Sequence, residues 1–153
     1  MYELLVSYRG WGVAAGLNDS VGWLLNNAAR LASRRLSAKL AGYNVTPPQW
    51  GVLVALWEED GLSLSELAKR SYFDGPTMTG IVDRLEKSNL VERRRESSDR
   101  RVISVYLTAE GRRLRAQLPS LSEEANQDAT AGLEQSEIDA LLTTLRKIIV
   151  NLS

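Results

Sequence analysis

Hydrophobic residues recur at helical spacing over the first part of the chain, between groups of polar and turn-forming residues. Asn18-Asp19-Ser20 can cap a helix, because short polar side chains accept hydrogen bonds from the first free N–H groups. Gly42 and Asn44 provide its end. The apolar positions that recur between these signals are Val21, Leu24, Leu25, Ala28, Leu31, Ala32, Leu36 and Leu40.

A second helix is predicted directly after the first. Thr46 caps it, and Pro47 and Pro48 lie in its first turn, where a missing N–H group costs nothing. Asp60-Gly61 closes it. Its apolar face consists of Val52, Leu53, Leu56 and Trp57.

Two shorter helices joined by a tight turn come next. Ser63 and Glu66 have the S-x-x-E spacing of a capping box, which predicts a short helix through Lys69. Asp74-Gly75-Pro76 indicates another helix start, and Asn89 ends that helix because asparagine tolerates the left-handed conformation. Its buried stripe is Met78, Ile81, Val82 and Leu85. The pair forms a helix-turn-helix.

The hydrophobic period then changes from helical to alternating. A strand can begin at residues 90–93. After the polar tip RESSDR, Ser104 and Tyr106 alternate with apolar neighbours, as in a second strand. Two short strands on either side of a polar tip predict a β-hairpin. Thr108 caps a further helix that is kinked or interrupted at Pro119. A last amphipathic helix carries Ile138, Leu141, Leu142, Leu145, Ile148, Ile149 and Leu152. This order predicts a mostly α fold with a small β-hairpin wing, a winged helix-turn-helix.

Composition excludes several classes of function. The 153 residues suit one soluble domain, and no apolar run approaches the ~18 residues that span a bilayer. The N-terminus lacks the basic region of a secretory signal, so the simplest location is a cytoplasm. The absence of Cys and His excludes thiol chemistry and histidine base catalysis and argues against a zinc or haem site. We therefore expect that the protein is not an enzyme and that it has no cofactor, no metal site and no membrane partner.

Charge is balanced overall but unevenly placed. There are 19 basic and 19 acidic residues, yet the segment ERRRESSDRR at residues 92–101 holds five arginines, and the tail beyond residue 120 is acidic. In isolation, a solvated charged loop is the simpler interpretation of this segment. Beside a helix-turn-helix, a basic hairpin instead favours DNA, because arginine suits a narrow groove next to the one that the recognition helix occupies.

The segment RLEKSNLVERRRESSDRRVISVYLTAEG resembles the wing signature of the multiple-antibiotic-resistance regulator (MarR) family. That pattern is RLExxGLVxR, then D-x-R, then a strand that ends in LTxxG. The element order and length also agree from about residue 19 to the C-terminus. The matching residues are Arg84, Leu85, Glu86, Leu90, Val91, Arg93, Asp99, Arg101, Leu107, Thr108 and Gly111.

The resemblance implies a homodimer that binds pseudo-palindromic double-stranded DNA. Residues 18–153 would form one unit, with dimerisation helices in 18–45 and 108–153 and a DNA-binding lobe in 46–107. Residues 1–17 would be an N-terminal extension whose order and role stay open. The first helix and the last two would interlock with the partner through Val21, Leu24, Ile138, Leu141, Leu145, Ile148, Ile149 and Leu152.

The resemblance also implies roles for individual residues. Arg101 would enter the minor groove and Asp99 would orient it. Gly80 stands where many members carry an arginine, and an arginine there would commonly read guanine. Its absence predicts fewer direct contacts to base edges. The whole expected DNA-contacting set is Ser63, Ser65, Pro76, Thr77, Thr79, Gly80, Arg84, Arg93, Arg94, Arg95, Ser98, Asp99, Arg100 and Arg101.

The resemblance also implies an effector pocket. Taken singly, each aromatic residue is better explained as core, but the resemblance places a pocket between the dimer helices and the winged lobe. Arg30, Tyr43 and Trp50 would line it and suit a small phenolic or aromatic ligand. The leading hypothesis is thus a DNA-binding transcriptional regulator, a repressor released by such a ligand. The alternative is a winged-helix protein-interaction module without DNA binding.

Overall fold

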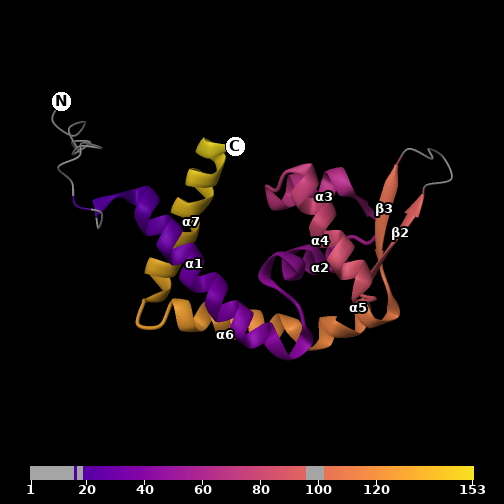
Figure 1. The fold of residues 1–153 in the computed structure, drawn as a ribbon. Coiled ribbons are helices and arrows are strands. Elements are labelled where there is room, and N and C mark those ends of the chain that lie inside the picture. Colours follow the sequence, from indigo (N-terminus) through magenta and orange to yellow (C-terminus); the bar gives the residue numbers. More distant parts are fainter. Residues whose placement is uncertain (1–15, 17–18, 96–101) are drawn as a thin grey trace.

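The computed structural model describes residues 16, 19–95 and 102–153, and it separates a winged lobe from a group of long helices (Figure 1). Among the described residues, no helix combines the length and the apolar character needed to cross a membrane. The elements in chain order are α1 (Val21–Leu40), η2 (Ala41–Tyr43), α2 (Pro47–Glu58), β1 (Leu62–Ser63), α3 (Leu64–Ser71), α4 (Gly75–Lys87), β2 (Val91–Arg95), β3 (Ile103–Leu107), α5 (Ala109–Arg113), η3 (Leu114–Ala116), α6 (Leu118–Ala129) and α7 (Gln135–Leu152).

The predicted helix boundaries are confirmed where local capping sets them. The Ser20 side chain accepts a hydrogen bond from the Trp23 N–H, and Thr46 forms a capping box with Gln49. Asn89 has φ +56°, the left-handed conformation expected at the end of α4. Tyr72 has φ +55°, which nothing in the sequence indicated.

The sheet has three strands rather than the two of the predicted hairpin. The order is β1-β3-β2, and both pairings are antiparallel. Ser63 of β1 pairs with Ser104 of β3. Ser104 is therefore buried, although the alternating pattern placed it on the outer face. A strand of two residues is too short to produce a pattern in the sequence.

The interruption predicted at Pro119 lies two residues earlier. The chain leaves helical geometry at Gln117, which has φ −120°, and Pro119 lies in the first turn of the new helix α6. The proline therefore starts a helix instead of bending one, since its missing N–H has no partner to lose at that position.

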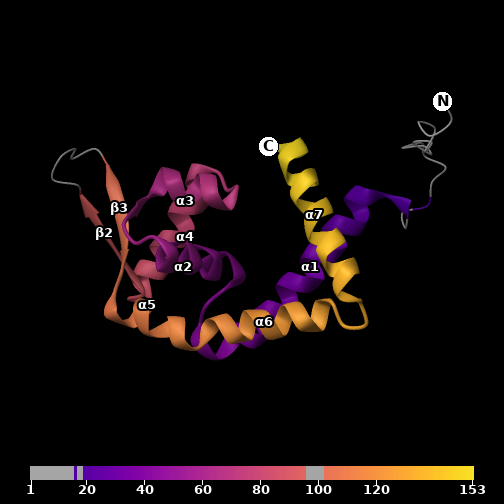
Figure 2. The same ribbon diagram turned by 180° about the vertical axis from the view of Figure 1, so that it is seen from behind.

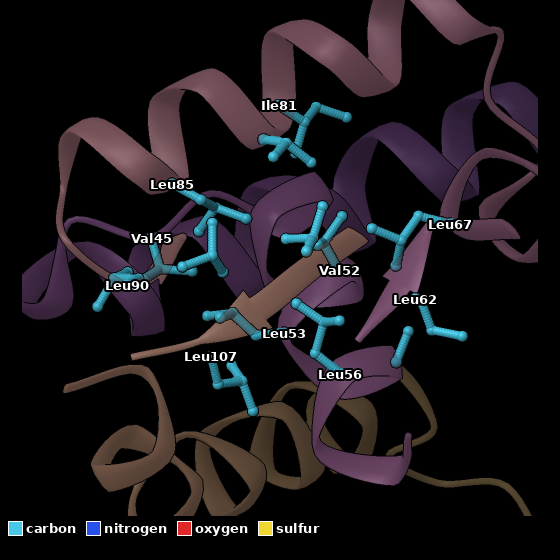
Figure 3. Close-up of a cluster of buried hydrophobic side chains, with 14 of the residues drawn as sticks. Val45, Val52, Leu53, Leu56, Leu62, Leu67, Ile81, Leu85, Leu90 and Leu107 are labelled. Carbon is cyan, nitrogen blue, oxygen red and sulfur yellow. The ribbon is translucent and has the colours of Figure 1, made fainter. Parts of the chain in front are cut away.

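The core lies inside the winged lobe. Side chains from α2, α3, α4 and the sheet meet there, among them Val52, Leu67, Ile81, Leu85 and Leu107 (Figure 3). The long helices α1, α6 and α7 extend away from the lobe, and both views show α1 and α6 side by side (Figures 1 and 2). By contrast, α7 has no buried residue, although its sequence is strongly amphipathic.

Candidate nucleic-acid interface

The helix-turn-helix is formed by α3, the turn around Tyr72 and α4. Ser63 caps α3 by accepting a hydrogen bond from the Glu66 N–H at 3.2 Å. The left-handed Tyr72 then reverses the chain, and the Phe73 N–H donates to the Ala68 carbonyl oxygen at 3.1 Å. α4 begins directly after this turn and runs beside the hairpin strands (Figure 1). The first turn of α4 and the wing therefore belong to one surface.

The N-terminal turn of α4 is fixed by Asp74. Its carboxylate accepts the Thr77 N–H at 2.7 Å. Hydrogen bonds from the backbone and the hydroxyl of Thr77 hold the pKa of Asp74 below its usual value. Pro76, Thr77 and Thr79 are exposed on this turn, and Gly80 is half-buried. The expected base-facing residues are therefore grouped on one accessible helix end.

Arg84 supplies a cation one turn further along α4. Its guanidinium lies over Gly80, with Nη1 3.7 Å from the position that a Cβ atom of residue 80 would take. Long side chains on a helix point toward its N-terminus, so the charge of Arg84 reaches back over the turn where Gly80 has no side chain.

Arg93 connects the wing to α4. Its Nη1 donates to Glu86 Oε2 at 2.7 Å, and its Nη2 lies 2.7 Å from Asp83 Oδ1. The same Nη2 lies 3.3 Å from the Thr79 carbonyl oxygen, and the Arg93 N–H donates to Glu86 Oε1 at 3.1 Å. Only 19% of the Arg93 side chain is exposed. Arg93 therefore supports the hairpin, and we call these contacts the Arg93 clamp.

The neighbouring arginines are more accessible. Arg94 pairs with Glu92, and its Cζ atom lies 4.6 Å from the ring centroid of Tyr106. Arg95 is exposed and has no ion pair within the described part of the chain. The remaining expected wing residues lie outside the described residues: Ser98, Asp99, Arg100 and Arg101.

The two serines expected to contact DNA differ. Ser63 is half-buried, and its hydroxyl donates to Glu66 Oε2 at 2.7 Å while capping α3. Ser65, two residues later, is exposed. Ser65 is thus more accessible to a phosphate than Ser63.

The LTxxG motif anchors the base of the wing. The Thr108 N–H donates to the Leu90 carbonyl oxygen at 3.1 Å, and the Thr108 hydroxyl donates to the Asn89 carbonyl oxygen at 2.7 Å. A Cβ atom on Gly111 would lie 2.1 Å from that Leu90 oxygen. Trp57 Nε1 donates to the Gly111 carbonyl oxygen at 2.9 Å. The motif is therefore a structural joint between α5, the end of α4 and α2.

Asp60 holds β3 in place, a role beyond the turn that the sequence indicated. Its Oδ1 accepts the Leu107 N–H at 2.8 Å and the Gly61 N–H at 3.2 Å, and its Oδ2 accepts Arg112 Nη2 at 2.8 Å. The Asp60-Gly61 pair indicated a turn, which it forms, with Gly61 at φ +81°. The contacts to β3 and α5 span about fifty positions of sequence and leave no local signal.

The three expected effector residues do not share one cavity among those found in the described part of the chain. Tyr43 lines a cavity of about 450 Å³ with Asn44, Arg113 and Gln117. Trp50 packs edge-on against Trp57, with ring centroids 5.4 Å apart. Arg30 is exposed, and its Nη2 donates to Asn27 Oδ1 at 2.9 Å.

Three of the eight expected dimer residues line an apolar groove. The groove has a volume of about 850 Å³, and Ile138, Leu141 and Leu145 line it together with residues of α1 and α6. Arg35 pairs with Asp128 at 2.8 Å beside it and lowers the pKa of that carboxyl group. Ile148 is half-buried, and the other expected residues are exposed: Val21, Leu24, Ile149 and Leu152.

Comparison with known proteins decides the family. The MarR family model matches residues 45–103. The HTH-type transcriptional regulator TtmR of Methylorubrum extorquens is 33% identical over 141 residues, which are 92% of this chain and 71% of TtmR. The chain belongs to the MarR family. It thus falls in a class of DNA-binding transcriptional regulators, and the winged-helix prediction is confirmed.

Solved MarR-type structures share the fold over most of both chains. The transcriptional repressor CouR, solved with a 23-mer DNA duplex, has a TM-score of 0.80 and 30% identity and covers 87% of this chain and 94% of its own. CouR of Rhodococcus jostii RHA1 was also solved with p-coumaroyl-CoA. BpsR of Bordetella bronchiseptica, whose DNA binding is regulated by 6-hydroxynicotinic acid, has a TM-score of 0.82 and 28% identity and covers 88% and 96%.

Proposed function

We propose that this MarR-family regulator binds pseudo-palindromic double-stranded DNA as a homodimer in the cytoplasm, represses transcription there, and is released by a small aromatic ligand. In each subunit α4 enters the major groove, while the wing reaches the neighbouring minor groove or backbone. Two-fold symmetry then requires two half-sites about one helical turn apart.

The Arg93 clamp is the observation that carries the DNA-binding proposal. It ties α4 to an arginine-bearing hairpin through three residues of that helix: Thr79, Asp83 and Glu86. A protein that reads two grooves at once needs these two elements in a fixed relation, because a loose pair would lose free energy to ordering on binding. The DNA complex of CouR, a similar chain, supports the same use of this fold.

The unpartnered helices support the homodimer. α7 exposes Leu141, Leu142 and Ile149 at 43%, 43% and 44%, values that are unusual for large apolar side chains on one face of a helix. A second copy would cover them, since an isologous interface buries the same apolar patch on both subunits.

The ligand part of the proposal has support from BpsR and CouR. BpsR responds to 6-hydroxynicotinic acid, and CouR was solved with p-coumaroyl-CoA, both aromatic compounds. In this chain, Tyr43 and Arg113 face the 450 Å³ cavity and would offer a ring surface and a cation to an aromatic acid. Arg113 also pairs with Glu110 at 2.7 Å, so a carboxylate would compete for that guanidinium.

Selection from random duplexes, followed by fluorescence anisotropy, tests DNA binding. We expect a two-fold symmetric sequence and an affinity that falls steeply between about 50 and 200 mM salt, since phosphate contacts release counterions. The protein-interaction alternative predicts no enrichment and no salt-dependent shift of any duplex. That result would reject the DNA-binding proposal.

The ligand is tested separately on the selected duplex. 6-Hydroxynicotinic acid and p-coumaroyl-CoA serve as the probes, and the emission of the four tryptophans reports binding. We expect an aromatic acid to lower duplex affinity and to change the emission. If neither readout responds to these probes or to a panel of related acids, release by an aromatic ligand is wrong while DNA binding stands.

A further inference from the structure

Thr79, on the exposed end of α4, uses its hydroxyl group inside the helix. Thr79 Oγ1 donates to the Gly75 carbonyl oxygen at 2.9 Å. The Thr77 N–H donates to the Asp74 carboxylate at 2.7 Å and fixes the first turn. The Thr79 hydroxyl therefore has no proton left to donate to a base edge unless it breaks its bond inside the helix.

The hydrogen bond of the Thr79 hydroxyl fixes what this side chain presents to the outside. Threonine in a helix has two accessible χ1 rotamers, and a bond from Oγ1 to the carbonyl group four residues back selects one of them. For Thr79, the Cγ2 methyl group is then held away from the helix backbone on an exposed side chain. The exposed end of α4 therefore presents the Thr79 methyl group to the outside.

The rest of this helix end offers no bidentate hydrogen-bonding side chain. Residues 74–80 read DGPTMTG and contain no Arg, Lys, Asn or Gln, the residue types that pair with guanine or adenine. Pro76 is exposed and has no donor, Met78 is buried, and Gly80 has no side chain. The first two turns of α4 therefore present apolar groups, and Arg84 is the first cation along this helix.

We propose that Thr79, with Thr77 beside it, reads the C5 methyl group of thymine in the major groove of each half-site. This inference rests on the proposed function, which places this end of α4 in the groove. Among the four standard DNA bases, only thymine presents a methyl group there, so apolar contact distinguishes it from the other three.

The size of the effect follows from the buried group. Burying one methyl-sized group contributes about fourfold in affinity, which is about 0.8 kcal/mol at 1.4 kcal/mol per tenfold. Two half-sites give up to about sixteenfold for the symmetric operator, provided that the sites act independently.

Replacement of thymine by deoxyuridine in the selected duplex tests the inference. This change removes the C5 methyl group and leaves the Watson–Crick and minor-groove edges intact, so readout by the wing keeps its hydrogen-bonding partners. We expect about a fourfold loss at one thymine per half-site and little change at the others. If replacement of thymine by deoxyuridine leaves the affinity unchanged at every position, the proposed readout of the methyl group is wrong.

Two matched variants of Thr79 separate its methyl group from its hydroxyl group. Thr79→Ser keeps the hydrogen bond to the Gly75 carbonyl and loses the methyl group in both subunits. We therefore expect it to bind the thymine duplex up to about sixteenfold more weakly and to lose discrimination against uracil. Thr79→Val keeps a methyl group and loses the hydrogen bond, so its discrimination should persist. Loss of discrimination in the valine variant alone would indicate hydroxyl readout and overturn the inference.

Arg95→Ala serves as the control on the DNA side of the experiment. Arg95 is exposed on the wing, so this variant should weaken binding to thymine and uracil duplexes equally. Circular dichroism melts confirm that each variant folds. Failure of the wild-type protein to bind any duplex would reject the proposed function itself, whereas specific binding that ignores uracil rejects only the methyl readout.

Discussion

Gly111 illustrates how a single residue determines the geometry of the wing. A Cβ atom at this position would lie 2.1 Å from the Leu90 carbonyl oxygen, a distance that no side chain tolerates. The same oxygen accepts the Thr108 N–H, so α5 cannot move away without losing that bond. The glycine of LTxxG is required by the close approach of two backbone segments.

Gly111→Ala should lower the free energy of unfolding by about 3 kcal/mol, because the backbone must shift to admit the methyl group. Urea unfolding followed by circular dichroism measures the change. Gly80→Ala is the matched control: its new Cβ atom meets only Arg84 Nη1 at 3.7 Å, so it should raise stability by up to about 1 kcal/mol. Equal effects of the two substitutions would contradict this account.

At the residue scale, the sequence predicted the features that depend on contacts between residues close together in the chain. Ser20, Ser63 and Asp74 cap helices through hydrogen bonds to residues three positions later, so their pattern is visible in the sequence. Trp57 and Asp60 form contacts about fifty residues away, and such contacts exist only after folding. The rotamer of Thr79 was equally invisible, although the residue itself was expected to face DNA.

At the scale of elements, the wing and the recognition helix behave as one unit because Glu86 holds Arg93 through its side chain and its backbone N–H. Glu86 and Arg93 belong to the RLExxGLVxR pattern, whose spacing therefore records a contact between α4 and β2. The strand β1 and the break at Gln117 had no comparable pattern, since two residues form no period and a proline fits either a kink or a helix start.

Glu86→Gln tests whether the contact between Glu86 and Arg93 affects DNA binding beyond the effect of the Glu86 charge itself. Removal of an acidic group near DNA should by itself strengthen binding, whereas loss of the Arg93 clamp should weaken it by about fivefold, or about 1 kcal/mol, because the two groove-reading elements lose their fixed relation. Anisotropy titration of the selected duplex gives the sign.

Glu92→Gln is the control for this prediction. It removes the same charge from the adjacent strand, where Glu92 pairs with Arg94 and not with α4. We expect it to bind DNA as tightly as the wild-type protein or more tightly. Tighter binding by both variants would show that the clamp contributes nothing to recognition.

At the scale of the whole molecule, the chain has more apolar helix surface than one copy covers. The winged lobe buries its core with help from Leu40 of α1 and Leu118 of α6, whereas α7 has no buried residue and lines the 850 Å³ groove. The amphipathic pattern of α7 predicted a buried face, and the structure of one chain does not by itself supply the surface that buries it.

Leu141→Glu should convert the protein to monomers, since a charge at the groove would be buried without a partner when two copies meet. Sedimentation equilibrium over a range of concentrations measures the change. Ser65→Glu introduces the same charge at an exposed position of α3 and should leave the dimer intact. A wild-type mass of one chain at all concentrations would exclude the homodimer.

The cavity lined by Tyr43 lies where the winged lobe joins the long helices. Its walls include Gly42 and Asn44, where the chain passes from α1 to α2, and Leu114 and Gln117, where it passes from α5 to α6. Both covalent routes between the lobe and the long helices bend at this one place. Tilting the lobe must therefore change the volume of the cavity, so a molecule that fills it would act as a wedge and set the angle at which the two halves of the subunit meet.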